Sequence, residues 1–195
     1  MKTLELVSVE DYLKQEETAF ERSEYHDGEI VAMAGAKPAH VLAVTNLIML
    51  LAFCLKKKKC KVYANDRLLY IKDCYKFVYP DVIIVCEDEK NLTKDGLEPL
   101  ENPSVIIEVL SESTEKYDRN EKFECYQTIE SLQQIVLVDY RQVLVETYTK
   151  NEKEEWVFVM KRDKSKTIKI GDCEILLEDI YDKIIFETTE EVKVG

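Results

Sequence analysis

Glycine and proline are scarce in this sequence of 195 residues, with five and four copies respectively. Their scarcity excludes collagen-like, linker-rich and low-complexity chains. Positive charge is also in short supply, because 27 lysines and arginines face 39 acidic residues and leave a formal net charge of −12. An acidic surface repels phosphate backbones and anionic lipids, so binding to nucleic acid would need a local basic patch.

The sequence also predicts neither an export signal nor a membrane span. Residues 1–10 carry two acidic residues and no long apolar run, so we predict no signal peptide. The longest apolar stretch, Val41–Leu55, has 15 residues and includes Thr45 and Asn46. It is too short and too polar for a bilayer span. We therefore expect a cytoplasmic protein without a membrane partner.

The six cysteines contain no Cys-x-x-Cys pair, and the sequence has only two histidines. This spacing argues against a zinc site. We expect the cysteines to be reduced thiols, several of them buried in the core.

Hydrophobic residues make up 46% and charged residues 34% of the chain, which indicates a globular protein with one domain over residues 1–195. Ser8 can cap a first helix, Asp27-Gly28 is typical of a hairpin turn, and Pro38 can begin a helix that runs to about Leu55. A strand is predicted over Lys61–Lys72.

Apolar runs at 82–86, 105–110 and 135–139 predict central strands covered on both faces. A helix is predicted from Ser113 to about Ile129, and a short acidic helix near the end of the chain. Antiparallel strands are predicted in the last third, at 144–149, 156–160, 167–170 and 173–177. The fold class is α/β (α+β), with a mixed central sheet flanked by helices and antiparallel C-terminal strands.

Glu108 interrupts one of these apolar runs. A lone buried carboxylate costs several kcal/mol unless it is paired, protonated or bound to a metal. An ion pair with a lysine and a functional role are equally compatible with the pattern. Asp81 opens the preceding run after Pro80, where it either caps a turn or points at the same spot as Glu108. Two converging carboxylates would suit Mg²⁺ or Mn²⁺.

Asp118, Lys122 and Tyr126 lie four residues apart on one face of the predicted helix. If that face looks at the strands, the Lys122 amine can reach the carboxylates and stabilise charge on a phosphate. A surface ion pair between Asp118 and Lys122 is the simpler interpretation of the same spacing.

These motifs together resemble one family over roughly Glu24–Ile135. The matching segments are Tyr79–Val85, Pro103–Ser111 and Ser113-Thr114, followed by Asp118, Lys122 and Tyr126. The pattern resembles the Uma-two family of endonucleases, in the PD-(D/E)XK restriction-endonuclease-like superfamily. The hairpin at Asp27-Gly28 and His40 at a helix start also resemble the N-terminal pattern of that family.

The resemblance implies a restriction-endonuclease-like fold, with Asp81, Glu108 and the backbone carbonyl of Val109 as metal ligands. The superfamily's lysine should stand two residues after Glu108, but that position is Leu110. Lys122 on the following helix would then replace it as the catalytic lysine.

Three further residues could belong to the site. Glu24 is either an accessory acid near the metal or a surface acid. His40 either contacts phosphate or water or simply starts a helix. Ser111 either binds a ligand near Glu108 or caps a turn.

Lys56–Lys61 forms the one basic run, which fits a phosphate-binding patch less well than a solvated helix end. The breadth of the apolar stretch Val41–Leu55 favours a homodimer through that helix or through the C-terminal strands. The leading hypothesis is a Mg²⁺-dependent (or Mn²⁺-dependent) DNA endonuclease with Asp81, Glu108 and Lys122 as catalytic residues. The alternative is a catalytically inactive binding or oligomeric scaffold, which Leu110 and the net charge favour.

Overall fold

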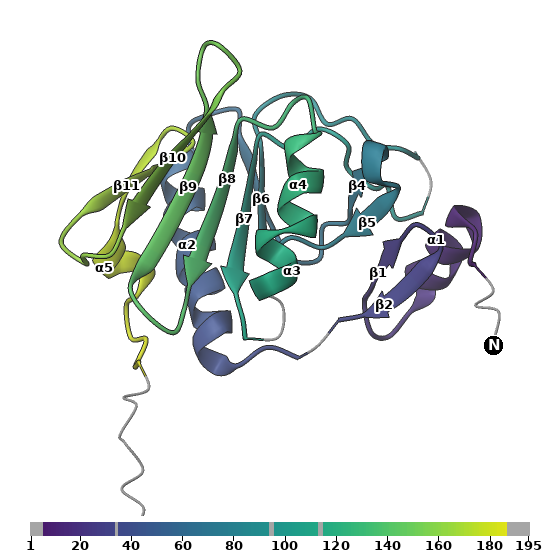
Figure 1. The fold of residues 1–195 in the computed structure, drawn as a ribbon, viewed down its shortest axis with the longest axis horizontal. Helices are drawn as coiled ribbons and strands as arrows, with labels where there is room; N and C mark the ends of the chain where they lie inside the picture. The colour runs from purple at the N-terminus through teal and green to yellow at the C-terminus, as the bar shows by residue number, and fades with distance from the viewer. Residues whose placement is uncertain (1–5, 34, 94–95, 113–114, 187–195) are drawn as a thin grey trace, which may run out of the picture.

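The computed structural model describes residues 6–33, 35–93, 96–112 and 115–186 (Figure 1). The predicted motif residues Ser113 and Thr114, and the tail after Phe186, lie outside the described residues.

A six-stranded sheet forms the centre of the molecule, in the order β10-β9-β8-β7-β6-β3. Only β7 and β8 are parallel neighbours among these described strands. The sheet is therefore mixed, as predicted. Its strands are β3 (Lys61–Ala64), β6 (Val82–Val85), β7 (Val105–Leu110), β8 (Gln134–Asp139), β9 (Leu144–Lys150) and β10 (Trp156–Lys161).

Helices cover both faces of this sheet, which explains why its central strands are continuous apolar runs. The helix α2 (Pro38–Leu55), α5 (Leu177–Ile180) and the hairpin of β11 (Thr167–Ile170) and β12 (Cys173–Leu176) pack on one face. On the other face lie α3 (Glu115–Arg119) and α4 (Glu121–Gln127), as Figure 1 shows. Alternate residues of β6 belong to the two cores: Val82 and Ile84 face α2, whereas Ile83 and Val85 face α4.

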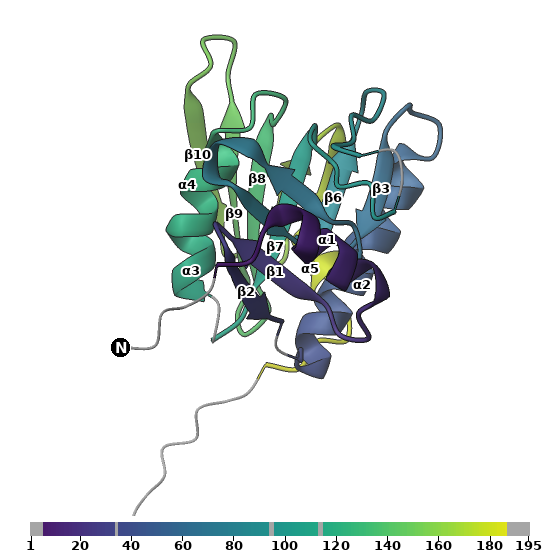
Figure 2. The same cartoon turned by 90° about the vertical axis from the view of Figure 1, so that its right-hand side faces the viewer.

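A second, four-stranded sheet has the order β2-β1-β5-β4 and lies beyond α3 and α4 (Figure 2). Its strands are β1 (Ser23–His26), β2 (Glu29–Ala32), β4 (Leu69–Ile71) and β5 (Lys76–Val78), with the 3-10 helix η1 (Lys72–Cys74) between the last two. The helix α1 (Val9–Thr18) packs on this sheet through Tyr12, and its first turn is capped by Ser8 as predicted. Asp27 and Gly28 both have positive φ, of 45° and 100°, and form the predicted hairpin turn.

Two predicted elements are divided in the structure. The helix expected from Ser113 to Ile129 is broken at Asn120, whose φ of −118° and ψ of −92° are not helical. Asp118 therefore lies on α3, whereas Lys122 and Tyr126 lie on α4. The strand expected over Lys61–Lys72 is also wrong as one element, because β3 joins the central sheet and β4 joins the second sheet.

The prediction of free cysteine thiols is wrong, because the structure pairs all six cysteines. Its disulfides are Cys54–Cys173, Cys60–Cys86 and Cys74–Cys125, with partners 119, 26 and 51 residues apart in sequence. Local spacing could not reveal them, because each bond joins elements that meet only in the folded chain.

The expectation that the stretch Val41–Leu55 is too short and too polar for a bilayer span is wrong, because α2 has 18 residues and is apolar enough, by length and composition alone, to cross a membrane. Core helices pass the same test, and six of its residues are buried against the rest of the molecule. One of these, Asn46, donates hydrogen bonds to the carbonyls of Ile180 and Asp182. In this structure α2 packs on one face of the central sheet, while Met49 and Phe53 remain exposed.

Candidate active site

Asp81 and Glu108 lie on neighbouring antiparallel strands. Val82 pairs with Ile107, so the next position of the same register sets Asp81 opposite Glu108. The backbone confirms the placement: Val109 N donates to Asp81 Oδ2 at 2.7 Å, and Asp81 N lies 3.4 Å from Glu108 Oε2. Asp81 and Glu108 therefore lie opposite each other at the end of the central sheet where β6 begins.

Glu108 is nearly inaccessible, with 4% of its surface exposed. Its Oε1 accepts a hydrogen bond from Tyr126 at 2.5 Å and lies 2.9 Å from Lys122 Nζ. Both partners project from α4, which packs on this face of β7. The helix thus supplies the donors that a carboxylate in an apolar strand requires.

Lys122 is buried among three acidic side chains. Besides Glu108, its amine contacts Glu24 Oε1 at 3.1 Å and Asp118 Oδ1 at 3.9 Å. Glu24 comes from β1 and also accepts a hydrogen bond from Tyr79 N at 3.2 Å. The expected approach of Lys122 to Glu108 is confirmed, and the surface-pair interpretation of Asp118 and Lys122 is wrong because both residues are buried.

Acidic groups outnumber basic ones in this cluster. Burial raises the pKa of Glu108 to about 8, helped by Asp118 and Asp81 and opposed by Lys122 and Tyr126. Burial also acts on Glu24, but Lys122 and His26 outweigh it and hold its pKa at about 2. The excess negative charge makes the cluster a place where a further cation would be stabilised.

Burial disfavours the charged amine of Lys122, but Glu108, Glu24 and Asp118 more than compensate. They hold the pKa of Lys122 well above its ordinary value. Lys122 is therefore a fixed positive charge at neutral pH and not a proton acceptor.

His40, near the start of α2, reaches the other side of the carboxylate pair. Its Nε2 lies 3.5 Å from Asp81 Oδ2, and its Nδ1 is buried without a hydrogen-bond partner in the described chain. Burial lowers the pKa of His40, but Asp81 and the backbone of Val109 outweigh it, so the pKa is raised overall. Ser111 lies just beyond β7, where its carbonyl accepts a hydrogen bond from Glu115 N.

The donor set suits a hard cation. No cluster of three or more His, Cys, Asp or Glu side chains arranged for metal binding occurs within residues 6–33, 35–93, 96–112 and 115–186. Mg²⁺, however, typically uses only one or two carboxylates and completes its shell with carbonyls, waters and substrate phosphate. Asp81 Oδ1 accepts no hydrogen bond from any described residue, so Asp81 and Glu108 fit such an ion.

Sequence reasoning missed two residues that complete the acidic cluster. His26 Nε2 lies 3.1 Å from Glu24 Oε2, and the hydroxyl of Tyr117 lies 3.1 Å from the same nitrogen. Alternation along β1 could have placed His26 on the same face as Glu24. Tyr117 gave no such signal, because its position depends on the break between α3 and α4.

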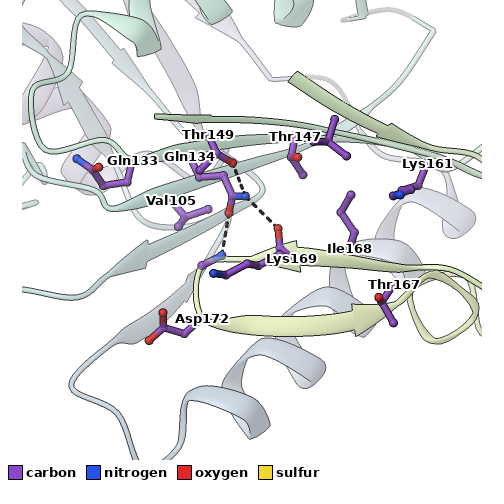
Figure 3. Close-up of a pocket in the computed structure, with 12 residues that line it drawn as sticks. Val105, Gln133, Gln134, Thr147, Thr149, Lys161, Thr167, Ile168, Lys169 and Asp172 are labelled. Atoms are coloured by element: carbon purple, nitrogen blue, oxygen red, sulfur yellow. Dashed lines mark hydrogen bonds between the residues drawn. The ribbon is translucent and has the colours of Figure 1, made fainter. Parts of the chain in front are cut away.

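A cavity of about 440 Å³ lies elsewhere, between the sheet and the β11–β12 hairpin (Figure 3). Gln134 bridges its walls by donating to Thr149 Oγ1 and to the carbonyl of Lys169, and by accepting from Gly171 N. None of its lining residues belongs to the carboxylate cluster. The carboxylate cluster therefore lies at the ends of β6 and β7, outside this cavity.

Solved structures support the fold. A crystal structure described as a putative nuclease belonging to DUF820, from Anabaena variabilis ATCC 29413, superposes with a TM-score of 0.72 at 15% identity. The match covers 92% of this chain and 99% of that one. The match shows the predicted fold class, a mixed central sheet flanked by helices with a small antiparallel hairpin near the C-terminus.

Sequence comparison gives the family. Residues 9–170 match Uma2, described as "Putative restriction endonuclease", and the chain belongs to that family. Two Synechocystis proteins are similar, the uncharacterized proteins sll1609 and slr1290. The first is 36% identical over 80% of this chain and 87% of its own length. The second is 32% identical over 78% of this chain and 79% of its own length.

Proposed function

We propose that the protein is a Mg²⁺-dependent (or Mn²⁺-dependent) endonuclease that hydrolyses phosphodiester bonds in DNA. The observation that carries the proposal is that Asp81 lies opposite Glu108 on neighbouring strands, while the Lys122 amine lies 2.9 Å from the Glu108 carboxylate. The family description, putative restriction endonuclease, supports the choice of DNA as substrate.

Asp81, Glu108 and the carbonyl of Val109 are the groups that would hold the ion. When bound, such an ion polarises a phosphate and acidifies a nearby water. Tyr126 and Lys122 fix the orientation of the Glu108 carboxylate through Oε1, which leaves Oε2 directed toward Asp81. The Lys122 charge is placed to stabilise negative charge that develops on the phosphate or to orient the attacking water.

In this proposal Glu24 and Asp118 position Lys122 and do not contact the substrate. Their contacts of 3.1 Å and 3.9 Å keep the amine charged and in place. His40 lies on the opposite side of Asp81 and is positioned to contact phosphate or water. Leu110, at the position of the superfamily's usual lysine, is fully buried in the core on the α4 side and has no part in the chemistry.

A cleavage assay tests the proposal on supercoiled plasmid and on single-stranded DNA, with Mg²⁺, with Mn²⁺ and with excess chelator. We expect cleavage only with a metal ion, and loss of cleavage in Asp81→Asn and Glu108→Gln. The matched control is Glu121→Gln, since Glu121 precedes Lys122 on α4 but has a largely exposed side chain.

Cleavage that continues in chelator, or that Asp81→Asn leaves undiminished, would place the chemistry elsewhere. Absence of cleavage on both DNA forms with either metal ion would favour the alternative, a catalytically inactive binding or oligomeric scaffold. Binding to DNA should weaken steeply with salt, because a few lysine and arginine side chains must hold the DNA against the protein's net charge of −12.

A further inference from the structure

The edge strand β10 exposes four consecutive apolar residues, Val157 to Met160, each with 40–49% of its surface accessible. Successive residues of a strand point to opposite faces, so both faces of this edge are open. Phe158 lies on the α4 face, where its ring is 4.9 Å from that of Tyr148. Val159 lies on the other face, beside the cavity of Figure 3.

The backbone of β10 is also unpartnered on its outer side. Its one hydrogen-bonded neighbour among the described strands is β9. An edge that is both apolar and unpaired is a template for another strand, and folded proteins usually protect it with charge, proline or a covering element. Here Trp156–Met160 contains neither charge nor proline.

The opposite edge of the same sheet is protected in the usual way. The strand β3 is two residues shorter than β10, begins at Lys61 and follows the lysine run of residues 56–59. Its neighbour α2 packs against it. Of the two edges of the central sheet, β10 is therefore the one that lacks protection against pairing with another strand.

Opposite charges flank the two ends of β10. Glu154 and Glu155 precede the strand, Lys161 ends it and Arg162 follows it. Glu154 pairs with Lys150 at 3.5 Å, whereas neither Lys161 nor Arg162 forms an ion pair within the described part of the chain. A strand with acid at one end and base at the other is complementary to an antiparallel copy of itself.

We propose that β10 pairs antiparallel with β10 of a second copy of this chain and joins the two six-stranded sheets across a two-fold axis. Such an interface is isologous, so every contact occurs twice. The proposal concerns assembly and is independent of whether the carboxylate cluster cleaves DNA.

The charges select one register. A two-fold axis requires one residue to face its own copy, and centring on Phe158 sets Glu155, the residue before the strand, opposite Lys161 at its end. The turn residue Glu154 then lies near Arg162. Centring on Val157 would bring the turn residue Lys153 near Lys161, and centring on Val159 would set Glu155 opposite Asp163. Like charges directly opposite each other destabilise a strand pair, so Phe158 is the expected centre.

Sedimentation of the full chain measures the assembly. We expect a particle of twice the chain mass of 22.8 kDa, and a monomer for Phe158→Lys, which sets two lysines face to face. Phe20→Lys is the control, because Phe20 is fully exposed and lies on neither sheet edge. Phe53→Lys tests the competing interface on α2, where Phe53 is 83% exposed.

Charge exchange and cross-linking test the register. Glu155→Lys and Lys161→Glu should each weaken the dimer, and the double variant should restore it. Phe158→Cys should form a disulfide between chains under oxidising conditions, whereas Met160→Cys should not, since two copies of Met160 would lie four residues out of register.

A wild-type monomer at high micromolar concentration would overturn the proposal. So would a dimer that survives Phe158→Lys but dissociates in Phe53→Lys. A monomer that instead binds an added foreign strand at β10 would show that the edge serves a different partner, and would equally overturn it.

Discussion

Lys122 on α4 and Glu24 on β1 form an ion pair at 3.1 Å although they are 98 positions apart in the chain. Because Lys122 also contacts Glu108 on β7, one amine links the small sheet, the helix and the central sheet. The link holds Glu24 and Glu108 against the same positive charge. The cluster is thus a structural junction as well as a candidate active site.

Lys122→Met should destabilise the fold at neutral pH, because it leaves the ionised carboxylate of Glu24 buried without its cation. Removing one partner of a buried ion pair costs about 3–5 kcal/mol. Urea denaturation measures the loss, and the double variant Lys122→Met/Glu24→Gln should recover part of it. Lys116→Met on α3 is the control, since Lys116 is exposed. Equal stability of both single variants would contradict the buried contacts.

Stability should fall between pH 5 and pH 8 in metal-free protein. Burial raises the pKa of Glu108 to about 8 from an ordinary value of 4.5. The folded chain therefore holds a proton that the unfolded chain has lost, and deprotonation favours unfolding as pH rises through this window. Glu24 acts in a separate window, because its pKa of about 2 makes its contribution complete above about pH 4.5.

Denaturation of wild type and Glu108→Gln across pH 5–8, in chelator, isolates this contribution. The wild type should lose more stability than Glu108→Gln, while His40 contributes with the same sign in both proteins. Glu121→Gln should keep the wild-type slope. Parallel pH profiles for wild type and Glu108→Gln would show that Glu108 titrates at its ordinary pKa.

Loss of the Cys54–Cys173 disulfide should destabilise the fold by about 2–4 kcal/mol. This bond joins α2 to β12 across 119 residues, so it constrains the unfolded chain more than Cys60–Cys86, which spans 26. We expect Cys54→Ser/Cys173→Ser to cost more than Cys60→Ser/Cys86→Ser in urea denaturation. Six titratable thiols in the denatured, unreduced protein would contradict the pairing.

Alkylation of thiols in intact cells before lysis measures whether the disulfides are present inside the cell. Cytosolic reductants keep thiols reduced, whereas oxidising compartments preserve disulfides. Protected cysteines in freshly quenched cells would argue against the cytoplasmic location predicted from the sequence. Fully alkylated cysteines would agree with it and would show that the bonds are not formed in the cell.

Most of the local helices, strands and turns could be predicted from the sequence. Pro38 marked the first residue of α2, Asp27-Gly28 marked the hairpin, and the apolar runs marked β6, β7 and β8 because burial on both faces leaves a continuous signal. The break in the single helix expected from Ser113 to Ile129 could not be predicted. Asn120 interrupts it through backbone angles that no side-chain periodicity encodes.

Long-range relationships were harder to predict. Glu108 was conspicuous because an acid inside an aliphatic strand needs a partner, and the spacing of Asp118, Lys122 and Tyr126 pointed to Lys122 as that partner. The neighbours His26 and Tyr117, and the three disulfides, depend on contacts between segments distant in sequence. Patterns within one segment carry no information about such contacts.

A calorimetric titration with Mn²⁺ tests most directly the central claim that Asp81 and Glu108 bind a divalent cation, because it requires no knowledge of the DNA target. The wild type should bind the ion, and Asp81→Asn and Glu108→Gln should each lower the affinity by about 100-fold or more, beyond the usual effect of outer-shell changes. Glu121→Gln should bind like the wild type. Mn²⁺ binding that is equally strong in Asp81→Asn, or no binding by the folded wild type, would contradict the account.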